Sequence, residues 1–185
     1  MAVSFFRLDF ADTPMTAHQH AIEQLKNYID ALAADEPIFG PSQALQQFGS
    51  EFRPSQDASS RLPRGDAKAC YSNATAYART HRDLFYSEGY ALDPAFPVPI
   101  QHAWLVDESG AVIDPTWKDA EQHVYFGVAF RADFLTEMMK HSEGECGLLV
   151  NWRLMRKHFA TPELLSAGLL SKSELPIARS PCPMS

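Results

Sequence analysis

Several short apolar segments of strand composition follow one another between residues 85 and 130 of the chain. The strands predicted there cover residues 85–92, 100–106, 111–114 and 125–130. Residues 107–110, Asp-Glu-Ser-Gly, are typical of a hairpin turn, and the three prolines within 93–99 predict a loop. Short connections between strands favour antiparallel pairing, because parallel neighbours need a long crossover.

Helical patterns lie on both sides of these strands. The segment from Thr16 to about Ala34 has apolar residues at spacings of three and four, with Thr13 or Thr16 as its cap: Ile22, Leu25, Ile29 and Leu32. Helices are also predicted over 41–48, 67–85, 131–141, 147–159 and 162–170, with a candidate strand at 3–10 and a polar loop at 50–66. This order predicts an α+β fold, in which a Cys-bearing helix packs on a small antiparallel sheet with flanking helices.

The length of 185 residues fits a single domain, which can bury roughly 70% of its unfolded surface. Hydrophobic residues make up 45% and charged residues 21%, which argues against a disordered chain. Within 1–185 we expect a helical N-terminal part at about 13–49, a core at about 65–130, a helical C-terminal part at about 131–172 and a flexible tail at about 173–185.

Charge and hydropathy restrict the partners. The net charge of −7, with no block of Lys or Arg, argues against nucleic acid, and no apolar run approaches the ~20 residues of a membrane span. The N-terminus has no basic region before its apolar residues, so we expect a cytoplasmic protein with reduced thiols.

Neither a metal nor a cofactor is expected. Cys70, Cys146 and Cys182 are far apart and form no C-x-x-C pair, so neither a zinc knuckle nor a redox dithiol is indicated. His18 and His20 are two residues apart in a predicted helix, where the side chains diverge by about 200° and do not face one site.

Three residues, Cys70, His102 and Asp114, form the pattern that carries chemistry. With Asp66 as the cap, Cys70 lies near the fourth residue of its helix, where free backbone N–H groups and a partial positive charge favour the nucleophilic thiolate. A turn centred near Ser109 places His102 opposite residue 116, which makes Asp114 a diagonal neighbour on the same face. These positions fit a nucleophile, its base and the group that orients the base.

Each residue also has a structural interpretation. A Cys near a helix start is often a small buried hydrophobe, a strand His is often a satisfied polar group, and an Asp before Pro often forms a turn. The combination, in this order along the chain, favours the catalytic interpretation.

The order Cys70, then His102-Ala103-Trp104, then Asp114-Pro115-Thr116 resembles the transglutaminase-like branch of the papain-like cysteine enzymes. The resemblance covers about residues 65–117, under a third of the chain. It implies that Cys70 is the nucleophile, His102 the general base and acid, and Asp114 the residue that orients His102. The superfamily includes peptidases, amidases, deamidases and acyl transferases.

Further residues are candidates for the pocket wall or for substrate binding: Trp104, Arg64, Asn73 and Trp117. Trp104 shares the strand face of His102 and is equally compatible with a core position, whereas Trp117 and Tyr125 fit the core better. Polar side chains upstream of Cys70 could complete an oxyanion hole: Gln56, Arg64 and Lys68. Cys146 lies in an acidic turn, where neighbouring carboxylates reduce the reactivity of a thiol. Glu143 and Glu145, in the same turn, could also rim a substrate cleft.

The sequence therefore predicts a cysteine-dependent acyl-transfer enzyme: an amidase, deamidase or peptidase. Its substrate would be a protein, a peptide, or a small amide or thioester. Two alternatives stay open: an inactive binding or effector module on the same scaffold, and an unrelated α+β protein.

Overall fold

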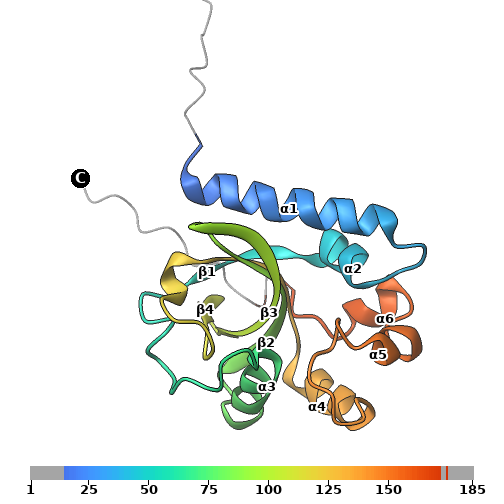
Figure 1. Ribbon diagram of the computed structural model, residues 1–185. Coiled ribbons are helices and arrows are strands. Elements are labelled where there is room, and N and C mark those ends of the chain that lie inside the picture. Colours follow the sequence, from blue (N-terminus) through green and yellow to red (C-terminus); the bar gives the residue numbers. More distant parts are fainter. Residues whose placement is uncertain (1–14, 172–173, 175–185) are drawn as a thin grey trace, which may run out of the picture.

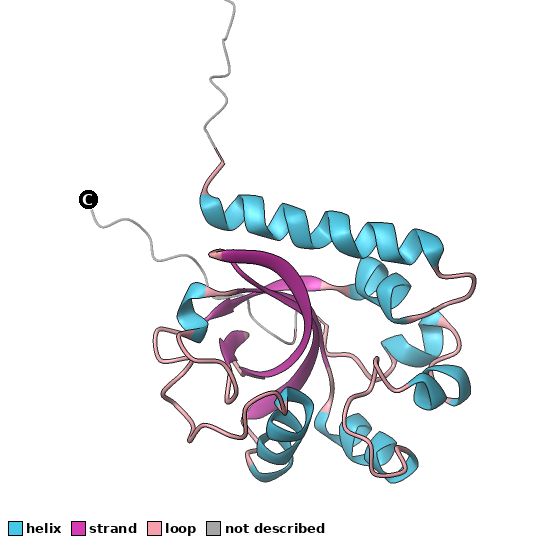
Figure 2. Ribbon diagram, viewed as in Figure 1, coloured by secondary structure: helices cyan, strands magenta, loops and turns pink. Residues whose placement is uncertain are grey.

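The computed structural model of the 185-residue chain describes residues 15–171 and residue 174. Helices surround a small closed sheet, with α1 and α3 on different sides of it and α4, α5 and α6 together on one flank (Figures 1 and 2). The elements are α1 (Ala17–Asp35), α2 (Pro41–Phe48), β1 (Ser50–Pro54), α3 (Cys70–Thr80), β2 (Leu84–Asp93), β3 (Phe96–Asp107), β4 (Ala111–Ile113), the 3₁₀ helix η1 (Ala120–Gln122), β5 (Val124–Ala129), α4 (Ala132–His141), α5 (Trp152–Lys157) and α6 (Pro162–Ser166). The predicted α+β class is confirmed.

The five strands close on themselves in the order β1-β4-β3-β2-β5. The pairs β2–β3, β3–β4, β2–β5 and β1–β5 are antiparallel. The prediction of a wholly antiparallel sheet is wrong for one pair, because β1 runs parallel to β4 through Arg53 opposite Ala111 and Pro54 opposite Val112. The parallel pair is possible because α3, β2 and β3 separate β1 from β4 along the chain.

Local sequence determines α1 and α2 much as predicted. The side chain of Thr16 accepts from the backbone of Gln19, whose side chain in turn accepts from the Thr16 backbone, a capping box at the start of α1. Leu25 and Ile29, from the predicted apolar stripe, are fully buried. Pro41 occupies the first turn of α2, where its missing N–H needs no partner.

Two predicted loops contain strands. Within 50–66, residues Ser50–Pro54 form β1, because Phe52 packs into the closed sheet and the backbone pairs with β4 and β5. Within 93–99, β3 begins at Phe96 after a tight turn, although the segment contains three prolines. Proline fits there because β4 pairs only with Leu105 and Val106, which leaves that edge of β3 without a neighbouring strand among the described residues.

The helix that carries Cys70 is shorter than the predicted 67–85. It begins at Cys70 with Ala69 as its cap, because Lys68 has a left-handed φ of 63° and ends any helical continuation toward Asp66. The predicted helix 147–159 shortens to α5, because Asn151 caps its start by accepting from the backbone of Arg153 and Leu154. The predicted helix 162–170 shortens to α6. The predicted helix 131–141 is confirmed as α4.

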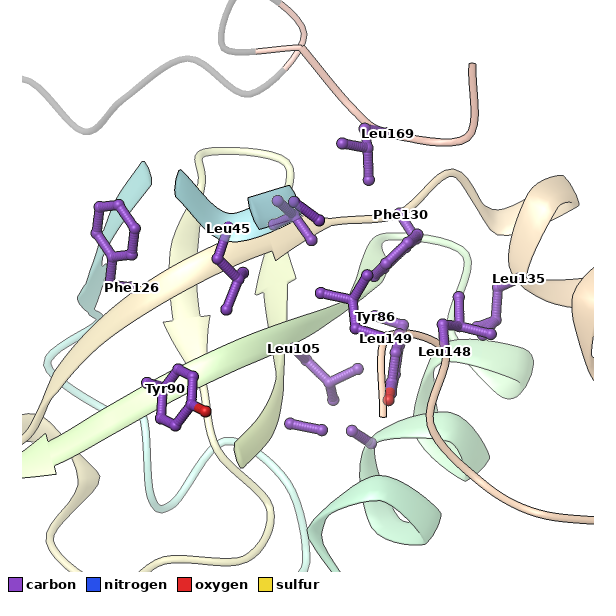
Figure 3. Close-up of a cluster of buried hydrophobic side chains, with 14 of the residues drawn as sticks. Leu45, Tyr86, Tyr90, Leu105, Phe126, Phe130, Leu135, Leu148, Leu149 and Leu169 are labelled. Carbon is purple, nitrogen blue, oxygen red and sulfur yellow. The ribbon is translucent and has the colours of Figure 1, made fainter. Parts of the chain in front are cut away.

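Two groups of buried side chains hold the fold together. The larger one lies between the outer face of the sheet and the helices, and Figure 3 shows Tyr86, Leu135, Leu148 and Leu149 within it. The smaller one fills the closed sheet and includes Phe52, Trp104 and Tyr125. Successive residues of β3 therefore alternate between the two groups.

Three further expectations concern membrane spans, the two ends of the chain and the number of domains. Among residues 15–171, no helix combines the length and the apolar character that a bilayer span requires. The candidate strand 3–10, the candidate cap Thr13, Cys182 and, apart from residue 174, the predicted tail lie outside the described residues. The single-domain organisation stays a prediction.

Candidate active site

The β3–β4 hairpin brings His102 and Asp114 together. Leu105 pairs with Ile113 and Val106 with Val112, the register that places His102 opposite residue 116. Asp114 follows directly after β4, and its Oδ2 lies 2.7 Å from Nε2 of His102. The predicted diagonal contact between these two residues is therefore present.

Four hydrogen bonds surround the buried Asp114 carboxylate. Oδ1 accepts from the backbone N–H groups of Thr116 (2.8 Å) and Trp117 (3.1 Å). Oδ2 accepts from His102 and from the Tyr125 hydroxyl, which lies 3.0 Å away. Burial alone would raise the pKa of Asp114, but the His102 ring and the backbone donors outweigh it and hold the pKa below its usual range. Asp114 is therefore a fixed anion beside His102.

Cys70 is the first residue of α3 and meets the other side of the His102 ring. Its sulfur interacts with the His102 ring and with the backbone N–H groups of Ala103 and Tyr71. Because Nε2 of His102 faces Asp114, the nitrogen left for the thiol is Nδ1. Burial would raise the pKa of Cys70, but the His102 ring and the two backbone N–H groups outweigh it and lower the pKa.

The His102 ring is 1% exposed and lies between two acidic groups. Burial would lower its pKa, but the hydrogen bond with Asp114 and then the interaction with Cys70 raise it to about 9. Trp117, half-buried, stacks on the ring with centroids 4.3 Å apart. The arrangement favours a Cys70 thiolate paired with a His102 imidazolium.

The candidate pocket residues have different positions. Trp117 covers His102, whereas Trp104 is fully buried inside the sheet, 6.3 Å from His102 between ring centroids, and is a core residue. Arg64 is exposed and, within the described part of the chain, makes no hydrogen bond or ion pair. Gln56 and Lys68 are exposed as well.

Asn73 fastens the loop before Cys70. Its Nδ2 donates to the backbone oxygen of Asp66 (2.8 Å) and to Oγ1 of Thr116 (2.9 Å), and its Oδ1 accepts from the Asp66 N–H (3.2 Å). Gly65 lies so close that an added Cβ would lie 2.3 Å from the Asn73 side chain. Asn73 therefore links the Cys70 helix to the turn after Asp114, and its amide is engaged in that link.

A donor for an oxyanion is available at the start of α3. Residues at the first turn of a helix have no intrahelical acceptor, and the first bond of this helix runs from the Asn73 N–H to Ala69. The backbone N–H of Cys70 has no partner among the residues that the structure describes. It can donate to an oxygen that develops negative charge next to Sγ.

The sequence patterns do not single out two polar residues in and near the site. Tyr125 fits a core position by its pattern, yet its hydroxyl is an additional donor to Asp114. Glu88 is 1% exposed within β2, and a charged residue inside an otherwise buried strand is the feature that could have singled it out.

Other candidate groups lie apart from these residues. Glu143 and Glu145 are exposed, and Glu143 pairs with Arg153. A cavity of about 870 Å³ opens beside α1, β1 and β5, and none of Cys70, His102 and Asp114 lines it. Within the described chain, no three His, Cys, Asp or Glu side chains are grouped to hold a metal ion, and His18 hydrogen-bonds with Glu51.

The geometry gathers a helix-start cysteine, a strand histidine and a buried aspartate into one connected group. Comparisons with family models, with curated proteins and with solved structures give no match to this chain.

Proposed function

We propose that the protein is a cysteine-dependent acyl-transfer enzyme, an amidase, deamidase or peptidase, with Cys70, His102 and Asp114 as its catalytic triad. The observation that carries the proposal is the buried His102 ring, which is hydrogen-bonded to the Asp114 carboxylate and also interacts with the Cys70 sulfur. A fold of the transglutaminase-like, papain-like type belongs to the same proposal. It is supported by a Cys-bearing helix packed against the strand that carries the histidine.

In the first half of the reaction, the Cys70 thiolate attacks the carbonyl carbon of an amide or thioester, and a C–S bond forms. The carbonyl oxygen becomes an oxyanion, to which the Cys70 N–H can donate. His102 then gives its Nδ1 proton to the leaving amine or thiol as the carbonyl bond to that group breaks. The product left on the protein is a thioester of Cys70.

In the second half, His102 takes a proton from water or an acceptor amine, which attacks the thioester carbonyl. The C–S bond breaks and the Cys70 thiolate returns. Asp114 stabilises the imidazolium and, through its bond to Nε2, keeps Nδ1 directed at the sulfur.

Such chemistry needs a reduced thiol, and Cys70 and Cys146 are both free. A cytoplasmic location and a protein, peptide, or small amide or thioester substrate are parts of the proposal, with no nucleic acid, membrane or cofactor involved. An inactive binding module would keep the same fold without turnover.

A panel of small amides, thioesters, glutamine-containing peptides and short peptides tests the proposal. We expect turnover of at least one class by the wild type and by Cys146→Ser, and none by Cys70→Ala, because loss of the nucleophile removes the covalent route. Turnover that survives Cys70→Ala would reject the thiol mechanism. Failure of the wild type to turn over any class would favour the binding module.

A further inference from the structure

Glu88 is a buried carboxylate that the proposed reaction does not use. It lies on β2 opposite Ala103 of β3, and the next pair along these strands is Gly89 with His102. Transfer of a carboxylate out of water is unfavourable unless its oxygens are satisfied by hydrogen bonds. The hydrogen-bond donors to the Glu88 carboxylate therefore indicate which part of the structure this residue stabilises.

Those partners belong mainly to the segment 147–150, between α4 and α5. Oε2 of Glu88 accepts from the N–H of Leu148 at 2.7 Å, and Oε1 accepts from the N–H of Val150 at 2.9 Å. The Tyr86 hydroxyl also donates to Oε2, at 3.0 Å. One carboxylate thus fixes two backbone groups of a segment about 60 residues away in the sequence.

The same segment lies against the residue that follows Cys70. A methyl group added at Gly147 would lie 2.5 Å from Cγ2 of Val150 and 3.2 Å from Cδ1 of Tyr71. The Tyr71 hydroxyl is buried and has no hydrogen-bond partner among the described residues. No polar contact of its own therefore holds this side chain, and packing against the segment restrains it.

The structure assigns to Glu88 a positioning role: it holds residues 147–150 against Tyr71 and thereby keeps Cys70 facing His102. This inference rests on the proposed thiol chemistry and names a residue outside the triad on which that chemistry depends. Tyr71 and Cys70 are adjacent in the first turn of α3, and the Tyr71 N–H also contributes to the lowered pKa of the Cys70 thiol. A shift of this turn therefore changes the contact between sulfur and imidazole directly.

Glu88→Gln tests the role without changing side-chain size. An amide has one acceptor oxygen, so either orientation directs its NH₂ group at the N–H of Leu148 or of Val150. The matched control is Glu36→Gln, because Glu36 likewise accepts two backbone N–H groups, those of Ser42 and Gln43, both at 2.9 Å. Glu36 lies in the connection between α1 and α2, and none of its bonds involves the candidate active site.

Gly147→Ala tests the same contact without altering any charge. Both Gly147 (φ 99°) and Gly144 (φ 87°) have left-handed backbones, so alanine at either position introduces similar strain. An added Cβ at Gly144 meets nothing within 4 Å, whereas at Gly147 it presses on Val150 and Tyr71. Gly144→Ala is therefore the control for strain alone.

The measurement is the rate at which iodoacetamide alkylates Cys70 as a function of pH, followed by mass spectrometry of the Cys70 peptide. We expect the wild-type midpoint to lie below the ordinary thiol pKa of about 8.5. In Glu88→Gln and Gly147→Ala it should rise by about one pH unit, which means about tenfold slower labelling at low pH. Glu36→Gln and Gly144→Ala should keep the wild-type profile.

The direction of the shift separates positioning from simple electrostatics. Removal of a nearby negative charge lowers a thiol pKa, so a rise in Glu88→Gln reports lost geometry. Wild-type profiles in both Glu88→Gln and Gly147→Ala would overturn this inference and leave the proposed function intact. If Glu88→Gln does not fold, the profile of Gly147→Ala decides alone. A wild-type protein in which Cys70 titrates as an ordinary thiol would overturn the proposed function itself.

Discussion

Asp114→Asn should uncouple the His102 ring from Cys70 while leaving the hairpin in place. The amide oxygen can still accept from the backbone of Thr116 and Trp117, but its NH₂ group then faces Nε2 of His102. Nε2 must become an acceptor, which favours neutral imidazole with its proton on Nδ1, the wrong tautomer for a base toward the thiol. The His102 pKa should fall from about 9 toward or below the ordinary 6.5.

The difference between a pKa of about 9 and one of 6.5 corresponds to about 3 kcal/mol of preference for imidazolium. His102 is almost fully buried, so little of this is lost to solvent screening. Because the folded-state pKa is raised, the stabilisation is fully present below about pH 6.5 and is lost as the pH rises through about 9. The difference in unfolding free energy between wild type and Asp114→Asn should therefore shrink over that range.

The assay is an NMR titration of the His102 ring, combined with urea unfolding at several pH values. Asp107→Asn is the matched control, because Asp107 also accepts two backbone N–H groups of a turn, those of Ser109 (2.9 Å) and Ala111 (3.0 Å). It should lower stability and leave the His102 titration unchanged. Identical His102 titrations in wild type and Asp114→Asn would refute the assigned electrostatics.

Cys70→Ala should abolish acyl transfer and lower the melting temperature only slightly, since deletion of a small half-buried thiol costs on the order of 1 kcal/mol; an enzymatic assay and a thermal melt check both. His102→Ala should approach the same loss of activity, because members of one catalytic unit are strongly non-additive. At neutral pH, iodoacetamide should label Cys70 faster than Cys146 in the folded protein, as peptide mass spectrometry can show, and the reverse order would count against an activated Cys70. Asn73→Ala removes three hydrogen bonds and should lower the unfolding free energy in urea by about 1–3 kcal/mol; an unchanged value would mean that the loop needs no such link.

The elements that local sequence determines were predictable. The periodic stripe and the Thr16 cap locate α1, and the turn at residues 107–110 locates the β3–β4 hairpin with the register that joins His102 to Asp114. In each case the residues that decide the structure lie within about a dozen positions of one another, so their spacing alone carries the information.

The strand β1 and the first residues of β3 were not predictable in the same way. Phe52 is the one apolar residue between Ser50 and Pro54, and the strand exists because β4 and β5, far along the chain, lie on either side of it. Pairing of this kind depends on tertiary context and overrides the local propensity of Arg53 and Pro54.

The candidate site likewise has features that local sequence predicts and features that depend on tertiary packing. Cys70, His102 and Asp114 could be singled out by residue type and order. The Ala103 N–H that helps to lower the thiol pKa and the Tyr125 hydroxyl that donates to Asp114 come from tertiary packing. The start of α3 shows the limit of local rules, since Asp66 has a good capping side chain but its backbone is bound by Asn73, and the helix begins four residues later.

Trapping of the acyl group tests the central claim, that Cys70 is the nucleophile, most directly. The protein is incubated with an activated thioester, quenched in acid, and examined by intact mass and by mapping of the modified peptide. We predict one acyl group on Cys70 in the wild type, and none on the corresponding peptide of Cys70→Ala or, at the same reaction time, of His102→Ala. Acylation of Cys146 with Cys70 unmodified, or equal acylation of Cys70 in the wild type and in His102→Ala, would contradict the account.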